Sequence, residues 1–204
     1  LYRGSGEFRR KPGDVLRLDR GAGRELTDLG IFLVATPGLE QPLLAEALAA
    51  GFADPVIVPG GVEARGPWPD VWRANLVLRC ATRVLVRVAE FRAMHLAQLD
   101  KRAHKIAWDQ ILKADHPVRV EATCRKSRIY HAGAAAQRIE RAITDVLGAP
   151  LAEDAAIVVK LRIEDDLAVI SLDSSGESLH KRGHKQAVGK APMRETKAAG
   201  FLYE

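Results

Sequence analysis

The residues best suited to chemistry in this sequence are cations, and most of them gather in one short segment. The segment follows a strand-like run that ends near Cys124, and it combines cations with a hydroxyl, a phenol and an imidazole: Arg125, Lys126, Ser127, Arg128, Tyr130 and His131. Cationic and hydroxyl side chains, with backbone N–H groups at a helix start, contact phosphate and sugar. Tyr130 either stacks on an unpaired base or belongs to the core. We therefore expect residues 125–131, the basic loop, to bind a polyanion.

Further cations extend this pattern in two directions. Arg119 precedes the basic loop on the strand, and Arg138 and Arg141 follow it, one helical turn apart. A second cluster lies near the end of the chain and consists of His180, Lys181, Arg182 and Lys185. This second cluster is either a further phosphate-binding surface or a charged connector between domains.

The overall charge leaves the partner open. The chain has 204 residues, with 31 Lys and Arg against 26 Asp and Glu, for a formal net charge of +5. This excess is modest, so the clustering of the cations carries more information than their number. On charge alone, a solvated basic surface and a polyanion-binding surface are equally good interpretations.

No catalytic or metal-binding signature accompanies the cations. The glycine-rich, Walker, HExxH, GxSxG and paired CxxC motifs are absent as functional units, and we expect no catalytic residue, metal or cofactor in this chain. His180 and His184 have a metal-ligand spacing, but Gly183 separates them and no further ligand follows.

Cys80 and Cys124 are unpaired, which favours buried thiols in a reducing compartment, the cytoplasm. No apolar run is long enough to span a membrane.

The elements that must position these residues form two small α/β units in series. In the first, apolar periodicity predicts a strand at 31–35, a helix at 39–51, strands at 56–58 and 62–65, a helix at 68–80 and a strand at 83–92. This β-α-β-β-α-β order is typical of the ferredoxin-like fold. Residues 1–24 are excluded as a cloning linker or leader segment.

The second unit carries the basic loop. The pattern predicts a helical segment at 96–112, a strand at 118–123, an amphipathic helix at 133–147, a hairpin of strands at 157–163 and 167–172, and a final helix at 191–203. Lys101, Arg102 and Lys105 are expected to form a solvated helix face. The hairpin turn is acidic, Glu164-Asp165-Asp166, rather than the favoured Asn-Gly type.

Several of these segments resemble one protein family. Residues 119–131 and 137–143 look like a THUMP domain, and 35–40 and 59–62 are similar to the ferredoxin-like region that precedes it in bacterial ribosomal-RNA guanine-N2 methyltransferases, also described as N6-adenine-specific DNA methylase-like. The segment LDSSGESLHKRGH at 172–184, with 191–196, resembles the connection from THUMP to methylase in that family. Lys197 and Gly200 depart from the apolar helix formers expected there.

The resemblance implies an α+β chain with a ferredoxin-like subdomain at 28–93, a THUMP-type α/β domain at 94–173 and a linker at 174–204. It implies an RNA-binding part, for ribosomal RNA, whose methyltransferase domain lies beyond this chain and uses S-adenosylmethionine. Alone, the chain is expected to be inactive. The alternatives are a basic protein-interaction module with no RNA role, and a small enzyme with a site around His131 or His180.

Overall fold

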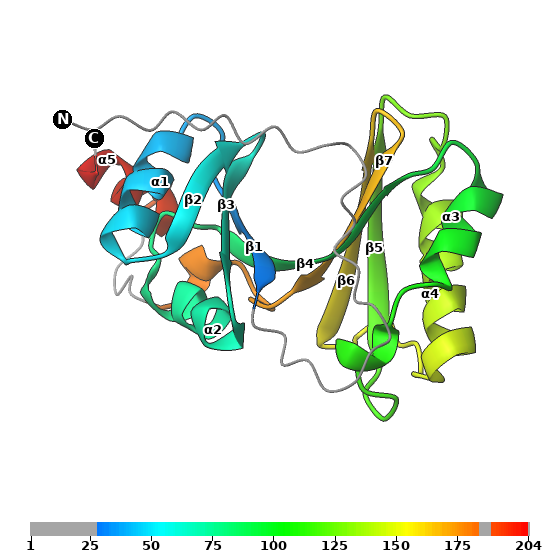
Figure 1. The fold of residues 1–204 in the computed structure, drawn as a ribbon. Helices are drawn as coiled ribbons and strands as arrows, with labels where there is room; N and C mark the ends of the chain where they lie inside the picture. The colour runs from blue at the N-terminus through cyan, green and yellow to red at the C-terminus, as the bar shows by residue number, and fades with distance from the viewer. Residues whose placement is uncertain (1–27, 184–188, 204) are drawn as a thin grey trace.

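The strands of this protein form one continuous sheet. The computed structural model describes residues 28–183 and 189–203, and its seven strands have the order β2-β3-β1-β4-β7-β6-β5 (Figure 1). The helices cover the outer side of the strongly curved sheet (Figure 1). The mixed α and β content and the sheet agree with the predicted α+β class. Within the described part of the chain, no helix is both long and apolar enough to cross a membrane.

The first half has the predicted ferredoxin-like topology. Its elements are β1 (Leu29–Val34), α1 (Glu40–Ala49), β2 (Ala53–Val58), β3 (Gly61–Gly66), α2 (Trp68–Val77) and β4 (Arg83–Arg92). β1 lies between β3 and β4, and all of these strands pair antiparallel. Apolar side chains of β1, β3 and β4 pack against α1 and α2 in a first core that includes Ile31, Leu43 and Val71.

The turn between β2 and β3 depends on glycine. Gly60 has a φ of +87°, in the left-handed region that favours glycine. At Gly61 a Cβ atom would lie 2.0 Å from the Leu33 carbonyl oxygen, so no larger residue fits beside β1. The Pro-Gly-Gly sequence that predicted a turn is therefore required by backbone geometry and by packing.

The second half is built around a parallel pair of strands. Its elements are α3 (Leu96–Ala103), the 3-10 turn η1 (Trp108–Gln110), β5 (Val118–Arg125), α4 (Ala132–Leu147), β6 (Ile157–Glu164) and β7 (Leu167–Asp173). β5 and β6 are parallel and are connected through α4, whereas β6 and β7 form the predicted antiparallel hairpin. Ile139, Ile143 and Leu161 belong to the second core, beneath α3 and α4.

β4 joins the two cores. It pairs with β1 on one side and with β7 on the other, and its register with β7 shifts between Arg87 and Ala89. Side chains along a strand alternate between the two faces of the sheet, and a bulge shifts this alternation by one residue. Val86 therefore contributes to the first core, whereas Ala89 and Phe91 contribute to the second. One strand therefore serves both halves of the molecule.

The helices predicted at 39–51 and 68–80 are each three residues shorter in the structure, and two others are shorter by five residues or more. The helix predicted at 96–112 ends at Ala103, because Trp108 turns into the second core, where it is fully buried and its Nε1 donates to the Ala103 carbonyl at 3.0 Å. The final helix, α5 (Glu195–Leu202), begins only after Pro192. Gly200, which departs from the family pattern, allows close packing on α1: its added Cβ would lie 2.8 Å from Leu39 Cδ1.

Candidate nucleic-acid interface

The basic loop is held in place by the acidic turn between β6 and β7. Asp165 and Asp166 adopt left-handed backbone angles, with φ values of 50° and 62°. The Asp166 carboxylate accepts a hydrogen bond from the Arg128 backbone N–H at 2.8 Å, and the Asp166 N–H donates to Ser127 Oγ at 3.1 Å. Ser127 Oγ in turn donates to the Arg125 carbonyl at 2.8 Å. Backbone and side-chain groups of this turn thus fix the middle of the basic loop.

The cations of the basic loop point toward solvent. Arg125 and Lys126 are exposed, and the Arg128 side chain keeps 64% of its surface accessible although its guanidinium lies 3.8 Å from Asp166 and 3.0 Å from Met94 Sδ. A hydrogen bond from Arg162, with the nearby charges of Arg125 and Lys126, lowers the pKa of Glu164. The loop therefore presents positive charge at the end of the β6–β7 hairpin.

Tyr130 is a surface residue. It is 84% exposed, whereas its neighbour Ile129 is buried in the second core. The structure thus excludes the alternative that Tyr130 belongs to the core. An exposed ring in a loop that carries cations is suited to stacking on a base.

His131 has a structural role at the start of α4. It is the N-cap residue, and its Nδ1 accepts a hydrogen bond from the Ala134 N–H at 3.0 Å. This contact satisfies one of the free N–H groups of the first turn and leaves Nε2 as the donor in the neutral ring. The positive end of the α4 dipole is thereby directed at the basic loop, where it favours anions.

Arg138 and Arg141 lie on α4, the helix that follows the basic loop. Arg141 is exposed and its Nε lies 3.3 Å from Asp145 Oδ2. The same carboxylate oxygen lies 3.2 Å from Nε2 of His104, at the end of α3. Arg138 is half-buried. These arginines therefore continue the cationic surface from the basic loop along the helix.

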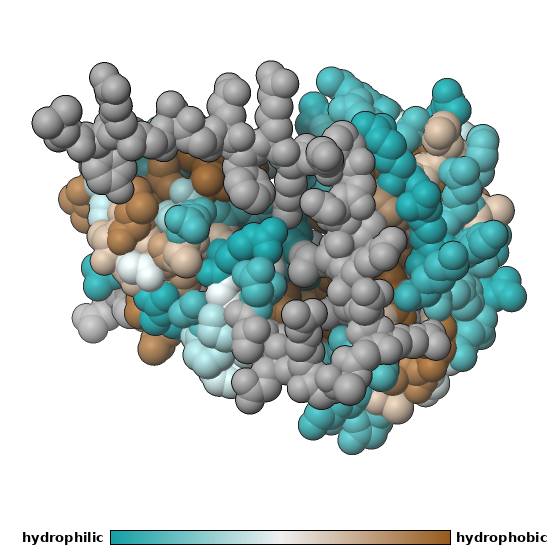
Figure 2. Space-filling model, viewed as in Figure 1, coloured by the Kyte–Doolittle hydropathy of each residue, from teal (hydrophilic) through white to brown (hydrophobic). Residues whose placement is uncertain are grey.

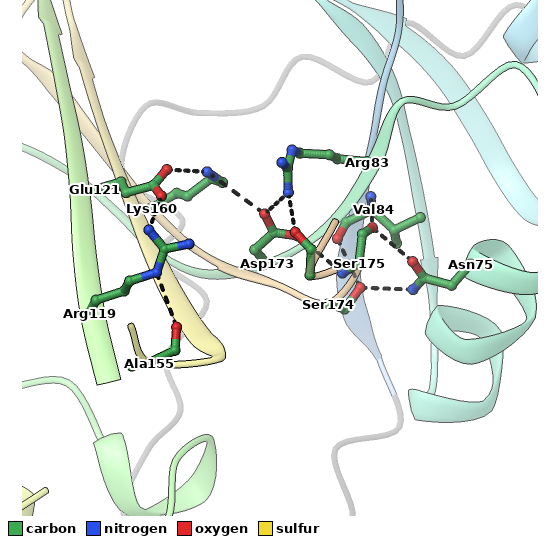
Figure 3. A network of polar contacts seen from close by, with 11 residues as sticks. Asn75, Arg83, Val84, Arg119, Glu121, Ala155, Lys160, Asp173, Ser174 and Ser175 are labelled. Atoms are coloured by element: carbon green, nitrogen blue, oxygen red, sulfur yellow. Dashed lines mark hydrogen bonds and ion pairs between the residues drawn. The ribbon is translucent and has the colours of Figure 1, made fainter. Parts of the chain in front are cut away.

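Arg119 occupies a different part of the sheet. It lies near the start of β5, where it donates to the Ala155 carbonyl at 3.1 Å and to Glu121 at 2.7 Å (Figure 3). Glu121 also binds Lys160 at 2.5 Å, and this hydrogen bond lowers the pKa of the Glu121 carboxyl. Arg119 is thus paired within β5 and linked through Glu121 to Lys160 on β6, near the opposite end of β5 from the basic loop.

The second cluster packs on the first half of the molecule. The Leu179 N–H donates to the Thr82 carbonyl at 2.9 Å, and the Arg182 guanidinium donates to the Asn75 carbonyl on α2. Burial lowers the pKa of Arg182. Lys181 is exposed, 3.5 Å from Glu177, and His180 is half-buried. The structure therefore does not bring this cluster to the basic loop; Lys185 and His184 lie outside the described residues.

The described residues offer no metal site or reactive thiol. No group of three or more His, Cys, Asp or Glu side chains within 28–183 and 189–203 is arranged to hold a metal. Burial, with the nearby Glu46, raises the pKa of Cys80 to about 12, and burial also raises the pKa of Cys124. Both thiols are therefore poor nucleophiles at neutral pH.

Two residues of this interface were not singled out from the sequence. Asp166 anchors the basic loop from 38 residues away along the chain, and Met94 contacts Arg128 from the segment before α3. The sequence offered one hint, the acidic turn between two predicted strands. A two-residue hairpin turn needs left-handed backbone angles at both residues, and Asp tolerates these angles. The contacts themselves arise from tertiary structure.

Comparisons with known proteins find similarity to ribosomal RNA methyltransferases. Residues 30–85 match the family model described as the RlmL ferredoxin-like domain. The chain is 34% identical over 179 residues to the ribosomal RNA large subunit methyltransferase K/L of Syntrophotalea carbinolica, covering 84% of this chain and 25% of that protein. It is 32% identical to the protein of the same name from Stutzerimonas stutzeri, with the same coverage. The chain thus spans about a quarter of the length of these relatives.

A solved structure shares both halves of the fold. The crystal structure of a predicted N6-adenine-specific DNA methylase from Listeria monocytogenes superposes with a TM-score of 0.78 at 28% identity. The match covers 86% of this chain and 48% of that protein. It therefore includes most of the second half of the molecule, beyond the residues that the family model matches.

Proposed function

Because the chain is related to the N-terminal region of the THUMP-domain RNA methyltransferases, we propose that it is the RNA-binding part of such an enzyme, with ribosomal RNA as its partner. It binds structured RNA and presents a nucleotide to a methyltransferase domain of the full-length protein. The ferredoxin-like subdomain corresponds to 28–93, the THUMP domain to 94–173 and the linker to 174–204. The cytoplasm, where ribosomal RNA is modified, is the proposed location.

One observation carries this proposal. Arg125, Lys126, Arg128 and Tyr130 are all exposed in one short loop, and the middle of this loop is fixed on the β6–β7 turn just before α4. A pre-organised loop loses less conformational entropy on binding than a flexible one. Its cations and helix N-terminus suit phosphate, and its ring suits a base.

Methyl transfer is assigned to the other domain. S-adenosylmethionine supplies the methyl group in this family, and we propose that it does not bind here. Equilibrium dialysis of the chain with labelled S-adenosylmethionine tests this assignment, and saturable binding would refute it.

Filter binding to ribosomal RNA tests the proposed function. The combined variant R125A/K126A/R128A should bind labelled RNA about tenfold more weakly than the unaltered chain at moderate salt. The control K113A/K190A/R194A removes the same charge from exposed positions outside the interface. Unlabelled ribosomal RNA should displace the probe, whereas polyglutamate should not. Equal binding by both variants would refute the role of the basic loop, and displacement by polyglutamate would favour an acidic protein partner.

A further inference from the structure

α3 and α4 lie side by side and run in the same direction. Just before the two helices, Met94 Sδ and Arg128 Nη1 are 3.0 Å apart. At their far ends, His104 Nε2 and Asp145 Oδ2 are 3.2 Å apart. Because one contact joins the starts and the other joins the ends, the helices are parallel, and the line along which they meet, the seam, begins at the basic loop.

Helical periodicity decides which side chains border this seam. On α4, Arg141 and Arg138 lie one and two turns before Asp145, on the same side of the helix. On α3, Lys101 lies one turn before His104 and is exposed. We call these residues the helix seam: Lys101, His104, Arg138, Arg141 and Asp145. The sequence pattern had indicated only a solvated face for Lys101.

The helix seam has an excess of positive charge. Asp145 is shared between Arg141 and His104, at 3.3 and 3.2 Å, and Asp100 Oδ1 lies 3.9 Å from His104 Nδ1, so two acids face three cations and one histidine. No acid lies within ion-pair distance of Lys101 or Arg138 in the described part of the chain. Glu140 is on the other side of α4, about 140° around the helix from Asp145. Hydrophilic residues dominate the surface over α3 and α4 (Figure 2, right side).

We propose that the helix seam binds the sugar-phosphate backbone of double-stranded RNA, as a continuation of the basic loop. This inference rests on the proposed function and names the form of RNA that the surface fits. α3 has 8 residues and α4 has 16, so the two helices flank the seam together over about 12 Å, and α4 continues beyond it. Lys101, Arg138 and Arg141 border it, and its one aromatic ring, that of His104, is half-buried and held through both nitrogens by the Asp100 carbonyl and the Asp145 carboxylate. Cations without stacking platforms favour duplex RNA, which is recognised through shape and phosphates, over single strands, which require stacking.

Tyr130 marks the end of this surface. The exposed ring stands at the start of α4, where the seam begins, and it suits an unpaired base. The arrangement therefore fits an RNA stem along the seam and an unpaired nucleotide at the basic loop.

Two RNA probes and two variants test this inference. Binding of a labelled 20-base-pair duplex RNA and of an unstructured 20-nucleotide strand is measured for the full chain, for K101A/R138A/R141A and for the control R102A. Arg102 lies about 160° around α3 from His104 and stacks on Phe91 at 5.6 Å, so it is outside the seam. Thermal unfolding checks that each variant is folded.

The inference predicts a selective loss. The seam variant should bind the duplex at least about tenfold more weakly, with a slope of log K against log salt shallower by about two to three, while single-strand binding changes less than about twofold. R102A should match the unaltered chain. An equal loss on both probes would overturn the assignment to duplex RNA. Unchanged duplex binding by the seam variant, with a loss in R125A/K126A/R128A, would overturn the seam and leave the proposed function standing. If no form of the chain binds either RNA, the proposed function fails.

Discussion

The carboxylate of Asp173, at the end of β7, lies 2.6 Å from Arg83 Nη1, at the start of β4 (Figure 3). The Asp173 side chain is 1% exposed, and it also lies 3.7 Å from Lys160 on β6. Next to it, the Ser175 hydroxyl accepts from the Val84 N–H at 2.8 Å and donates to Asn75 of α2 at 2.8 Å. Residues from both halves of the molecule therefore meet at the segment that resembles a linker.

Replacement of Asp173 should weaken the whole fold. Asp173→Ala leaves Arg83 without its buried partner, and loss of one member of a buried pair costs about 3 kcal/mol. Chemical denaturation should show this decrease in the free energy of unfolding. Asp28→Ala is the matched control, because the Asp28–Arg65 pair is exposed at 64% and 48% and contributes at most about 1 kcal/mol. Equal effects of the two substitutions would contradict the structural role of Asp173.

Removal of the Asp166 carboxylate should weaken RNA binding, although it makes the chain more positive. Asp166→Ala deletes the acceptor of the Arg128 N–H, so the basic loop loses a charge-assisted hydrogen bond worth about 1.5–3 kcal/mol. Part of this loss should appear as a roughly threefold to tenfold rise in the Kd for RNA, measured by fluorescence anisotropy. Asp166→Asn keeps an acceptor and should bind nearly as well as the unaltered chain. Tighter binding by the alanine variant would show that charge alone governs the loop.

The contact between α3 and α4 should depend on pH. Hydrogen bonds to the Asp100 carbonyl and to Asp145 raise the pKa of His104 above its ordinary value of 6.5, while Arg141 shares Asp145 with the imidazole. Because the folded-state pKa is raised, the stabilisation of the fold by protonated His104 is fully present below the ordinary pKa. It is lost as pH rises through the folded-state pKa. The difference in Tm between the unaltered chain and His104→Gln should therefore be larger at pH 5.5 than at pH 8.5. The reverse order would contradict the pairing.

The sequence predicts the fold well where periodicity is local. The alternation in β4, β6 and β7 and the apolar stripe of α4 locate these elements, because one face of each is buried. The helix ending at Ala103 was missed because the fully buried Trp108 redirects the chain through a tertiary contact. The β4 bulge was missed for the same reason, since only the partner strand reveals a register shift.

The candidate interface was predictable only in part. The cations of the basic loop are adjacent in sequence, so their clustering is visible without a structure. Their anchor, Asp166, and the seam contact between His104 and Asp145 join residues distant in sequence. Arg182 belongs to a basic cluster in the sequence, yet its guanidinium binds the Asn75 carbonyl. Composition cannot distinguish a cation that is free for a ligand from one that is used within the fold.

The salt dependence of RNA binding is the sharpest test of whether the basic loop contacts RNA phosphates. The Kd of the chain for a ribosomal RNA stem-loop is measured from 50 to 300 mM salt, beside R125A/K126A/R128A. Affinity should fall steeply with salt, and the variant's slope of log K against log salt should be shallower by about two to three, because three phosphate contacts are lost. If the two proteins have the same affinity and the same slope of log K against log salt, the basic loop is not the RNA-binding surface.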